Sequence, residues 1–389
     1  MPATPKIPTR QLQRGDFASA CKDDPNCLVY FLLNVGDGDT QLLLLPEGRD
    51  GARRAIVVDI ATTKKLPRLL DSLAEADVLR EPKEGTALFP VVVATHPHED
   101  HIGGMPEFLD GFGKLIGEFW EPGYFHPSAR FVEMMRAVED LKEDLSIEHL
   151  QPTSGTTRFI GKVKVTALGP GIGLRNRFQS YGIEVNDASI SLKVEFPAAR
   201  IAQDGRNRHY LRLREPWCLV LGADAQTTSW AQATVDFPQL HRREDSLLFR
   251  ELKAALGVDT LRAQVFKVPH HGSKHGLNIE LIERLAPWFS LVSSTGGGGR
   301  YGFPHFLAVE AIREALQPIT TSKAKRVPDY RLGIHYTSDV DSGDRPLGSI
   351  ALVLSPTRGA GRKGAQLWRF RDGPGEPVRL EEARVFRPQ

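Results

Sequence analysis

Residues 91–104 read VVVATHPHEDHIGG, a run of β-branched residues followed closely by four side chains of the kinds that bind metals. The three valines predict a buried strand, and the loop after it presents His96, His98, Asp100 and His101 within six positions. Imidazole is the commonest protein ligand for zinc, and a carboxylate suits a harder or second ion such as manganese. The spacing therefore predicts two adjacent metal sites, one at the first two histidines and one at the Asp-His pair.

A surface loop that is merely rich in histidine is the simpler explanation of the same residues. The spacing and the preceding strand argue against it, and so do Gly103 and Gly104, which allow a tight entry into a helix. We therefore expect this loop to lie at the end of a strand and to face ligands from other strands.

Residues of the same kinds follow two later predicted strands. Asp224 comes after the apolar run CLVLGA, and His270 and His271 come after VFKVP. Strand ends collect functional groups in layered α/β folds, so Asp224 is expected to bridge two metal ions. One of the two histidines would complete the ligands of the second ion, and the other would orient substrate or support a ligand. The alternatives are a helix N-cap for Asp224 and a purely structural role for the histidines.

The rest of the chain alternates predicted strands and helices around these segments. Strands are expected at 28–33, 40–45, 55–58, 90–94, 163–168, 190–196, 217–221, 263–268, 289–293, 349–354 and 366–370. Helices are expected at 65–76, 129–144, 244–256, 279–286 and 308–316. No repeat or linker divides the pattern, so we predict one domain over 27–371, a flexible lead-in over 1–26 and a C-terminal tail over 372–389.

The composition sets broad limits on the class of protein. The 389 residues are 41% apolar and 25% charged, with a net charge of +2, as is ordinary for a soluble globular protein. Three cysteines are too few for a disulfide framework. The N-terminus lacks the apolar core of a signal peptide, and no run approaches the length of a membrane span. We therefore expect a cytoplasmic protein that does not contact a membrane.

Several motifs together resemble a known family. The segments THPHEDHIGG (95–104), LGAD (221–224) and KVPHHGS (267–273) resemble those of the metallo-β-lactamase fold. The segments NVGDGD (34–39), NDAS (186–189) and RYGFPH (300–305) are similar to those of one subgroup, the hydrolase domain of the competence DNA-uptake proteins and their soluble relatives. The resemblance spans roughly residues 28–370, and the motifs follow the family order.

The sequence departs from that subgroup at a few positions. Asp37 replaces its usual Gln, Ile60-Ala61 replaces a Gly pair, and Phe303 replaces a His. The wider family also has a lone His between the His loop and the bridging Asp. The histidines in that interval have no clear strand-end context and are not expected to bind metal: His126, His149 and His209. Asn186 or Asp187 is expected near the first ion instead.

The resemblance implies a four-layer αββα sandwich that holds two divalent ions, zinc or manganese, and hydrolyses its substrate by attack of a metal-bridging hydroxide on phosphorus. The expected metal ligands are His96, His98, Asp100, His101, Asp224, His270 and His271. The expected catalytic residues are Asp100, Asp224 and His271. The expected substrate contacts are Asn34, Asp39, Asn186, Ser189, Ser273 and Lys274.

The resemblance favours a nuclease or phosphodiesterase that acts on DNA, with an activating protein partner left open. Basic clusters that would neutralise phosphates are Arg200, Arg206, Arg208, Arg212 and Arg214, then 241–243, then Lys323, Lys325, Arg326 and Arg331. Scattered surface charge would explain them equally well, because acidic and basic residues nearly balance. The alternatives are a hydrolase of a lactone, thioester or β-lactam, and a binding module without catalysis.

Overall fold

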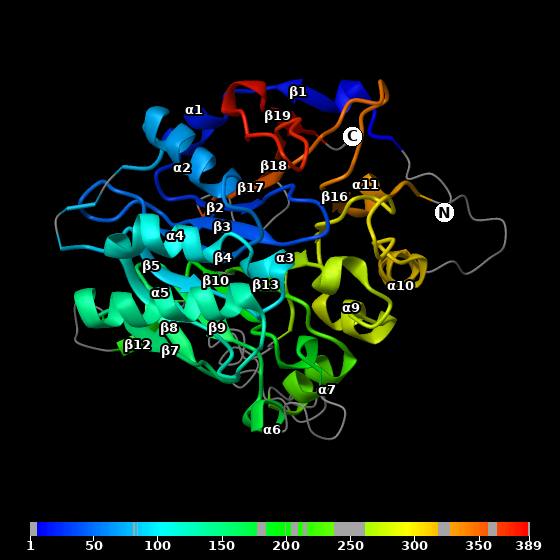
Figure 1. Cartoon of the computed structure of the whole chain (residues 1–389). Helices are drawn as coiled ribbons and strands as arrows, with labels where there is room; N and C mark the ends of the chain where they lie inside the picture. Colours follow the sequence, from blue (N-terminus) through cyan, green and yellow to red (C-terminus); the bar gives the residue numbers. More distant parts are fainter. Residues whose placement is uncertain are drawn as a thin grey trace.

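The computed structural model describes residues 6–80, 82–83, 85–176, 184–198, 200–203, 209–212, 216–236, 261–317, 327–356 and 364–387. Two mixed β-sheets pack face to face in this part of the chain, and helices cover the outer face of each (Figure 1). The protein therefore has the four-layer αββα architecture of the metallo-β-lactamase fold, as the sequence predicts.

The first sheet has the strand order β1-β19-β18-β17-β2-β3-β4-β5-β6-β7. Its strands are β1 (Leu12–Arg14), β2 (Leu28–Leu32), β3 (Thr40–Leu44), β4 (Ala55–Ile60), β5 (Phe89–Val93), β6 (Ile116–Trp120), β7 (Glu148–Leu150), β17 (Ile350–Leu354), β18 (Ala365–Arg369) and β19 (Arg384–Phe386). From β4 to β7 the neighbouring strands are parallel, and the rest of this sheet is antiparallel.

The second sheet has the order β16-β15-β14-β13-β10-β9-β8. Its strands are β8 (Thr157–Ile160), β9 (Val163–Ala167), β10 (Leu192–Phe196), β13 (Trp217–Leu221), β14 (Val265–Lys267), β15 (Phe289–Val292) and β16 (Ile334–Tyr336). The strands from β13 to β16 run parallel. A separate hairpin, β11 (Arg200–Gln203) with β12 (His209–Arg212), lies in the expected Arg-rich segment.

Helices cover the sheets through two outer cores. Apolar residues of α1 (Phe17–Lys22), α2 (Lys65–Glu75), α4 (Met105–Phe112) and α5 (Ala129–Leu145) pack on the first sheet. Those of α7 (Thr227–Asp236), α9 (Ile279–Leu285) and α10 (Phe306–Leu316) pack on the second. The remaining helices are short: α3 (Glu99–Ile102), α6 (Ile172–Asn176) and α11 (Asp329–Leu332), with 3-10 turns at Thr9–Gln11, Gly113–Leu115, Asn186–Ala188, Pro269–Gly272 and Leu380–Glu382. Among the described helices, none is long and apolar enough to cross a membrane.

The strands next to the metal loop are buried on both faces. β2, β3 and β4 are buried at every residue, because one face meets the helices and the other meets the second sheet. Strands covered on both faces have nearly continuous apolar sequences, as the run from Ala55 to Val58 shows. Such strands form a rigid support for the polar groups at their ends.

Residues 6–27 differ from the flexible lead-in that the sequence predicts. β1 pairs with β19, and α1 places Phe17 and Cys21 in the first outer core at 0% exposure. The expected tail also belongs to the domain, because β19 pairs with β18 and Asp372 is buried beside Lys65. The partners in the β1–β19 and Lys65–Asp372 pairs are more than 300 residues apart in sequence, so local composition does not reveal them. The predicted helix at 244–256 lies outside the described residues.

Candidate metal centre

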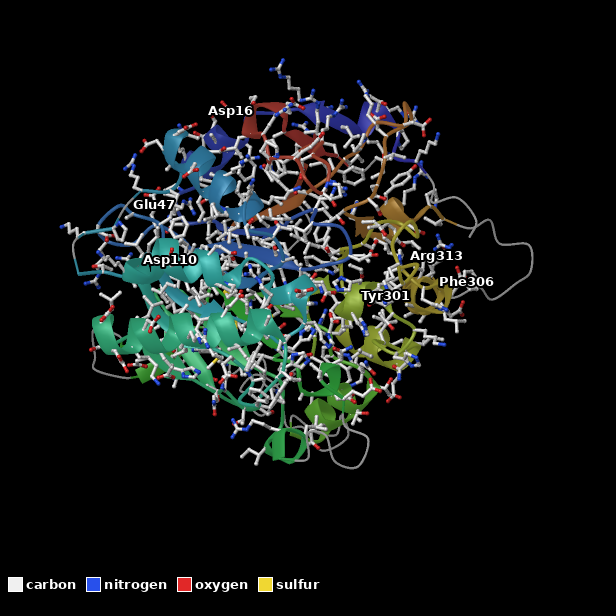
Figure 2. The ribbon with its side chains drawn as sticks, in the orientation of Figure 1. Asp16, Glu47, Asp110, Tyr301, Phe306 and Arg313 are labelled. Atoms are coloured by element: carbon white, nitrogen blue, oxygen red, sulfur yellow. The ribbon has the colours of Figure 1, made fainter. Side chains whose placement is uncertain are left out.

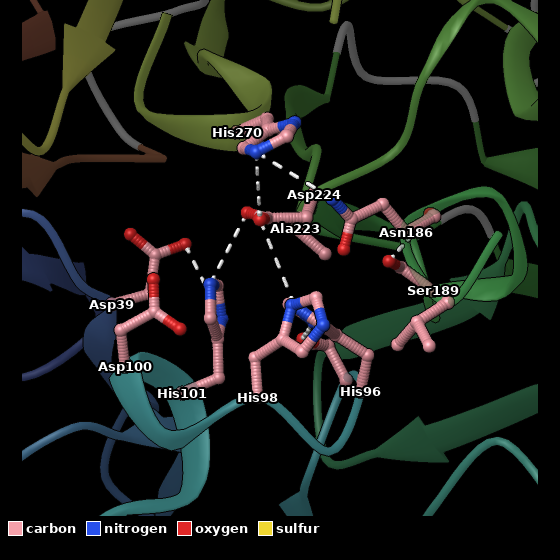
Figure 3. Close-up of polar contacts among 12 residues, drawn as sticks. Asp39, His96, His98, Asp100, His101, Asn186, Ser189, Ala223, Asp224 and His270 are labelled. Atoms are coloured by element: carbon pink, nitrogen blue, oxygen red, sulfur yellow. Dashed lines mark hydrogen bonds and ion pairs between the residues drawn. The ribbon is translucent and has the colours of Figure 1, made fainter. Parts of the chain in front are cut away.

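The loops after β5 and β13 bring the first group of ligand atoms together (Figure 3). Nε2 of His101 lies 3.1 Å from Oδ1 of Asp224, and Nε2 of His96 lies 3.6 Å from its Oδ2. All three side chains are buried, and their ligand atoms lie within 4.8 Å of one another. The His loop of the first sheet therefore faces a carboxylate of the second sheet at the edge of the sandwich where β5 and β13 end.

A second group shares His101 with the first and contains Asp100 and His271. Nε2 of His271 lies 3.5 Å from Oδ2 of Asp100 and 3.7 Å from Oδ1 of Asp224. Asp224 therefore lies between the two groups, where a bridging carboxylate is expected. Of the two adjacent histidines, His271 is the one whose imidazole faces Asp100.

His98 and His270 lie at the edge of the first group. Nδ1 of His98 is 3.1 Å from Nε2 of His96, and Nε2 of His270 is 3.6 Å from Oδ2 of Asp224. His270 remains 19% exposed, whereas His271 is 1% exposed. His270 thus lies over the group on its solvent side, and His98 lies beside it.

Hydrogen bonds at Nδ1 leave the Nε2 atoms of three histidines facing the centre. Nδ1 of His101 donates to Oδ2 of Asp59 at 2.7 Å, and Nδ1 of His271 donates to the carbonyl of Ser293 at 3.2 Å. Nδ1 of His96 lies 3.1 Å from the hydroxyl of Thr95. A hydrogen bond at one ring nitrogen fixes which nitrogen remains free to bind a metal.

The buried atoms and charges of the site fit a divalent cation. Nε2 of His101, Nε2 of His271 and Oδ1 of Asp224 are buried without a hydrogen-bond partner, which is costly unless an ion satisfies them. Burial lowers the pKa of His101, but the carboxylates of Asp224 and Asp59 more than offset this and hold that pKa well above its usual range. The acidic groups therefore draw positive charge into this buried space, and a cation at the same place would supply it.

The turns that carry these ligands adopt left-handed backbone conformations. The φ angles are 58° at Asp59, 46° at Ala223, 48° at His270 and 52° at His271. Non-glycine residues rarely adopt this region, and such strained residues concentrate at functional sites. Gly104 has a different reason to be glycine, because a Cβ there would lie 2.5 Å from the backbone of Thr62. The close approach of the Thr62 backbone thus requires a glycine at the end of the His loop.

Asp59 supports the centre although sequence reasoning did not assign it a role. Its carboxylate is fully buried, and it accepts hydrogen bonds from the amide of Thr95 at 2.8 Å and from the hydroxyl of Thr95 at 2.7 Å, besides that of His101. Asp59 therefore holds both the start of the loop and the ring of His101. In the sequence, the position of Asp59 after an apolar strand is the feature that could have indicated this supporting role.

Two of the expected substrate contacts, Asp39 and Asn34, face inward and have partners within the protein. Asp39 is 0% exposed and accepts a hydrogen bond from the ammonium group of Lys267, which is also 0% exposed. Asn34 is buried, and Nδ2 of its side chain donates to the backbone carbonyl of Asp372 at 3.0 Å. Neither side chain can reach a substrate in the cleft, because the ion pair and the backbone contact occupy them.

The other expected contacts have mixed placements. Nδ2 of Asn186 lies 3.5 Å from Nε2 of His270, whereas the hydroxyl of Ser189 donates to the carbonyl of Asn186 at 2.7 Å. Ser273 is buried, and Lys274 is exposed beside it. Lys274 therefore remains available to a substrate, whereas Asn186 is buried beside His270, and Ser189 stabilises the turn that carries Asn186.

The three remaining histidines of the interval are placed differently from one another. The ring of His126 lies 6.0 Å from that of His98, at the end of the loop after β6. His149 is paired with Glu121 at 3.1 Å. The side chain of His209 lies outside what the structure describes. His126 is thus nearer to the candidate centre than its sequence context suggested.

Solved structures that resemble this chain share little sequence with it. The metallo-beta-lactamase fold protein YhfI from Bacillus subtilis is 9% identical, with a TM-score of 0.33, and 74% of this chain and 91% of that chain are covered. Igni18, a metallo hydrolase from Ignicoccus hospitalis, is 13% identical at a TM-score of 0.31, covering 68% of this chain and 82% of the other. CmlA, a diiron beta-hydroxylase from Streptomyces venezuelae, is 10% identical with a TM-score of 0.32. The match covers 70% of this chain and 45% of CmlA, so this chain spans less than half of the length of CmlA.

No curated protein sequence matches the chain. Residues 49–171 match the family model described as the metallo-beta-lactamase superfamily. This segment contains β4, β5 and the His loop, whereas Asp224 and His271 lie beyond it. The two sheets with their outer helices supply the remaining layers of the same fold. Residues 49–171 are therefore similar to the metallo-β-lactamase superfamily, and the whole of the described chain has the corresponding fold.

Proposed function

We propose that the protein is a hydrolase with two divalent metal ions that cleaves phosphodiester bonds in nucleic acid. The observation that carries this proposal is the pair of ligand groups that overlap at His101, with Asp224 between them. Two ions held close together lower the pKa of a water, polarise a phosphoryl oxygen and stabilise the leaving oxygen. Zinc and manganese are the ions that suit imidazole and carboxylate ligands in this mixture.

The position of each side chain determines whether it would hold an ion or accept a proton. His96, His98 and Asp224 would hold the first ion, and Asp100, His101 and His271 would hold the second, with Asp224 shared between them. The Asp100 side chain is 39% exposed, whereas that of Asp224 is only 2% exposed. Asp100 is therefore the carboxylate that can also accept a proton from a water beside the substrate, and Asp224 serves only to hold the ions.

Support for a nucleic-acid substrate comes from the motifs and from exposed cations. The motifs at 34–39, 186–189 and 300–305 resemble those of the competence DNA-uptake hydrolase domains. Lys274 and Arg300 are exposed on the loops that surround His270. Most members of the predicted basic clusters lie outside the described residues. Arg331 is exposed on α11, and Arg200 and Arg212 lie in the hairpin of β11 and β12.

One observation favours the second candidate, a hydrolase of small apolar esters or lactones. A cavity of about 520 Å³ is lined by the apolar side chains of Tyr124, Phe125, Phe131 and Met135, with charged residues such as Arg136 and Glu139 also in its lining. The ring of Phe131 lies 6.4 Å from that of His126, which in turn lies near His98. An apolar acyl chain would bury its surface there, since such cavities bind ligands mainly through apolar contact.

A substrate panel at two salt concentrations separates the two candidates. The protein, loaded in turn with zinc and manganese, is offered single-stranded DNA, double-stranded DNA, RNA, a chromogenic phosphodiester and a lactone. A nuclease should cleave a nucleic acid and weaken as salt rises, because about three phosphate contacts reduce affinity roughly tenfold between low and physiological salt. The Asp100→Ala variant, purified in the same way, measures contaminating nuclease. Salt-insensitive lactone hydrolysis without cleavage of any nucleic acid would overturn the proposal.

A further inference from the structure

A ladder of aromatic rings leads from the candidate metal centre to the surface. The ring centroid of Phe303 lies 5.4 Å from that of His270 and 5.8 Å from that of His271. Tyr301 stacks on Phe303 at 5.7 Å with an angle of 28° between the ring planes. The guanidinium of Arg300 lies 5.5 Å from the centre of the Tyr301 ring. Tyr301 is therefore two ring-to-ring steps from His270.

The loop that carries this ladder is anchored to the metal-binding turn. The amide of His305 donates to the carbonyl of Gly272 at 2.8 Å, and the amide of Gly297 donates to the carbonyl of Phe303 at 2.6 Å. Gly302 has a φ of 66°, which lets the chain reverse between the two stacked rings. The rings therefore keep a fixed position relative to His270 and His271.

Tyr301 ends the ladder on the segment of chain that joins β15 to α10, and it is 63% exposed (Figure 2). An exposed ring already held in a stacked geometry can accept another flat ring once the exposed Arg300 side chain, which lies over it, swings aside. Two exposed cations, Arg300 over the ring and Lys274 two residues beyond Gly272, are available to phosphates of the same ligand. An aromatic platform with cations around it is the arrangement on which single-stranded nucleic acids stack their bases.

We propose that Tyr301 is a stacking platform for an unpaired base of single-stranded nucleic acid whose phosphodiester bond lies at the metal centre. This inference rests on the proposed function and narrows its substrate class. In a double helix the bases are already stacked and paired, so their faces are not free for the tyrosine. The protein should therefore bind single strands more tightly than duplexes of the same sequence.

The test compares two ligands that differ only in their bases. One is a fluorescein-labelled oligothymidylate with phosphorothioate linkages, which resist cleavage, and the other is an abasic oligomer with the same length and linkages. Fluorescence anisotropy gives the Kd of each for the metal-loaded full chain. Tyr301→Ala should weaken oligothymidylate binding roughly 5- to 150-fold and leave abasic binding unchanged. Tyr301→Phe should retain binding, because stacking needs the ring and not the hydroxyl.

Phe159 provides the matched control, since it is 65% exposed and lies on β8, which carries none of the expected ligands. Phe159→Ala should bind both oligomers like the unsubstituted protein. The platform proposal would be overturned if Tyr301→Ala bound oligothymidylate as tightly as the unsubstituted protein does. It would also be overturned if Tyr301→Ala weakened binding of the abasic oligomer as much as binding of oligothymidylate. If the unsubstituted protein still cleaves nucleic acid in that case, the proposed function survives. Absence of both binding and cleavage in the unsubstituted protein would instead overturn the proposed function and the platform with it.

Discussion

Replacing Lys267 by Met should destabilise the fold sharply, because the lysine neutralises a carboxylate that water cannot reach. Both Lys267 and Asp39 are 0% exposed, and the ammonium group also donates to the carbonyl of Ala223 at 3.3 Å. Oδ1 of Asp39 lies 3.9 Å from Nδ1 of His271, and its Oδ2 lies 4.0 Å from Nδ1 of His101. The ion pair thus lies directly behind two expected ligands.

The size of the effect follows from the burial of the pair. Removing one partner of a buried ion pair leaves an uncompensated charge and costs about 3–5 kcal/mol, whereas removing both is often nearly neutral. Met keeps most of the volume of Lys, so little of the loss should come from packing. We expect Lys267→Met to lose about 3 kcal/mol or more, and addition of Asp39→Asn to recover much of that loss.

Urea unfolding followed by circular dichroism, with chelator present so that metal binding does not contribute, measures all four members of this cycle. Lys142→Met is the control, because Lys142 pairs with Glu139 at the surface of α5 and such pairs contribute about 1 kcal/mol at most. A coupling energy below about 0.5 kcal/mol between Lys267 and Asp39 would refute the reasoning, since that is the range of independent sites.

Three other predictions concern the metal centre. Elemental analysis of protein purified without chelator should give about two divalent ions per chain, and less than half an equivalent, with no activation on adding metal, would contradict the two ligand groups. Asp100→Ala should abolish turnover with an unchanged circular dichroism spectrum, whereas His126→Ala should retain most of it; equal losses would make His126 a ligand. Asp59→Asn should weaken metal affinity roughly 10- to 100-fold, measured by competition with a chelating dye, because the ring of His101 loses its charged acceptor. Unchanged affinity would show that Thr95 and the loop backbone suffice to hold that ring.

Much of the fold could be predicted because its strands are covered on both faces. The strand at 217–221 matches β13, and the helix at 129–144 corresponds to α5, Ala129–Leu145. Continuous apolar runs and helical periodicity are local signals, so they do not depend on distant partners. The parallel pairing of β4 with β5, and of β13 with β14, also follows from the alternation of strands and helices.

The inward orientation of Asp39 could not be predicted from its glycine turn. Its partner Lys267 is 228 residues away in sequence. A turn rich in glycine and aspartate is compatible with a ligand loop and with a buried ion pair. The packing of α1 could not be predicted for a similar reason, because only two of its residues, Phe17 and Cys21, are fully buried. Phe17 packs on Trp368 and Phe370 from the far end of the chain as well as on Phe31.

The pairing of β2 with β17 has a consequence for synthesis of the protein on the ribosome. Both strands are buried at every residue and lie next to each other in the first sheet, yet Leu32 pairs with Ile350. At 5–20 residues per second, a growing chain makes β17 roughly 15–60 s after β2. During that time β2 has one unpaired, apolar edge, and such edges recruit other chains. The nascent polypeptide should therefore depend on chaperones that shield this edge until translation is nearly complete.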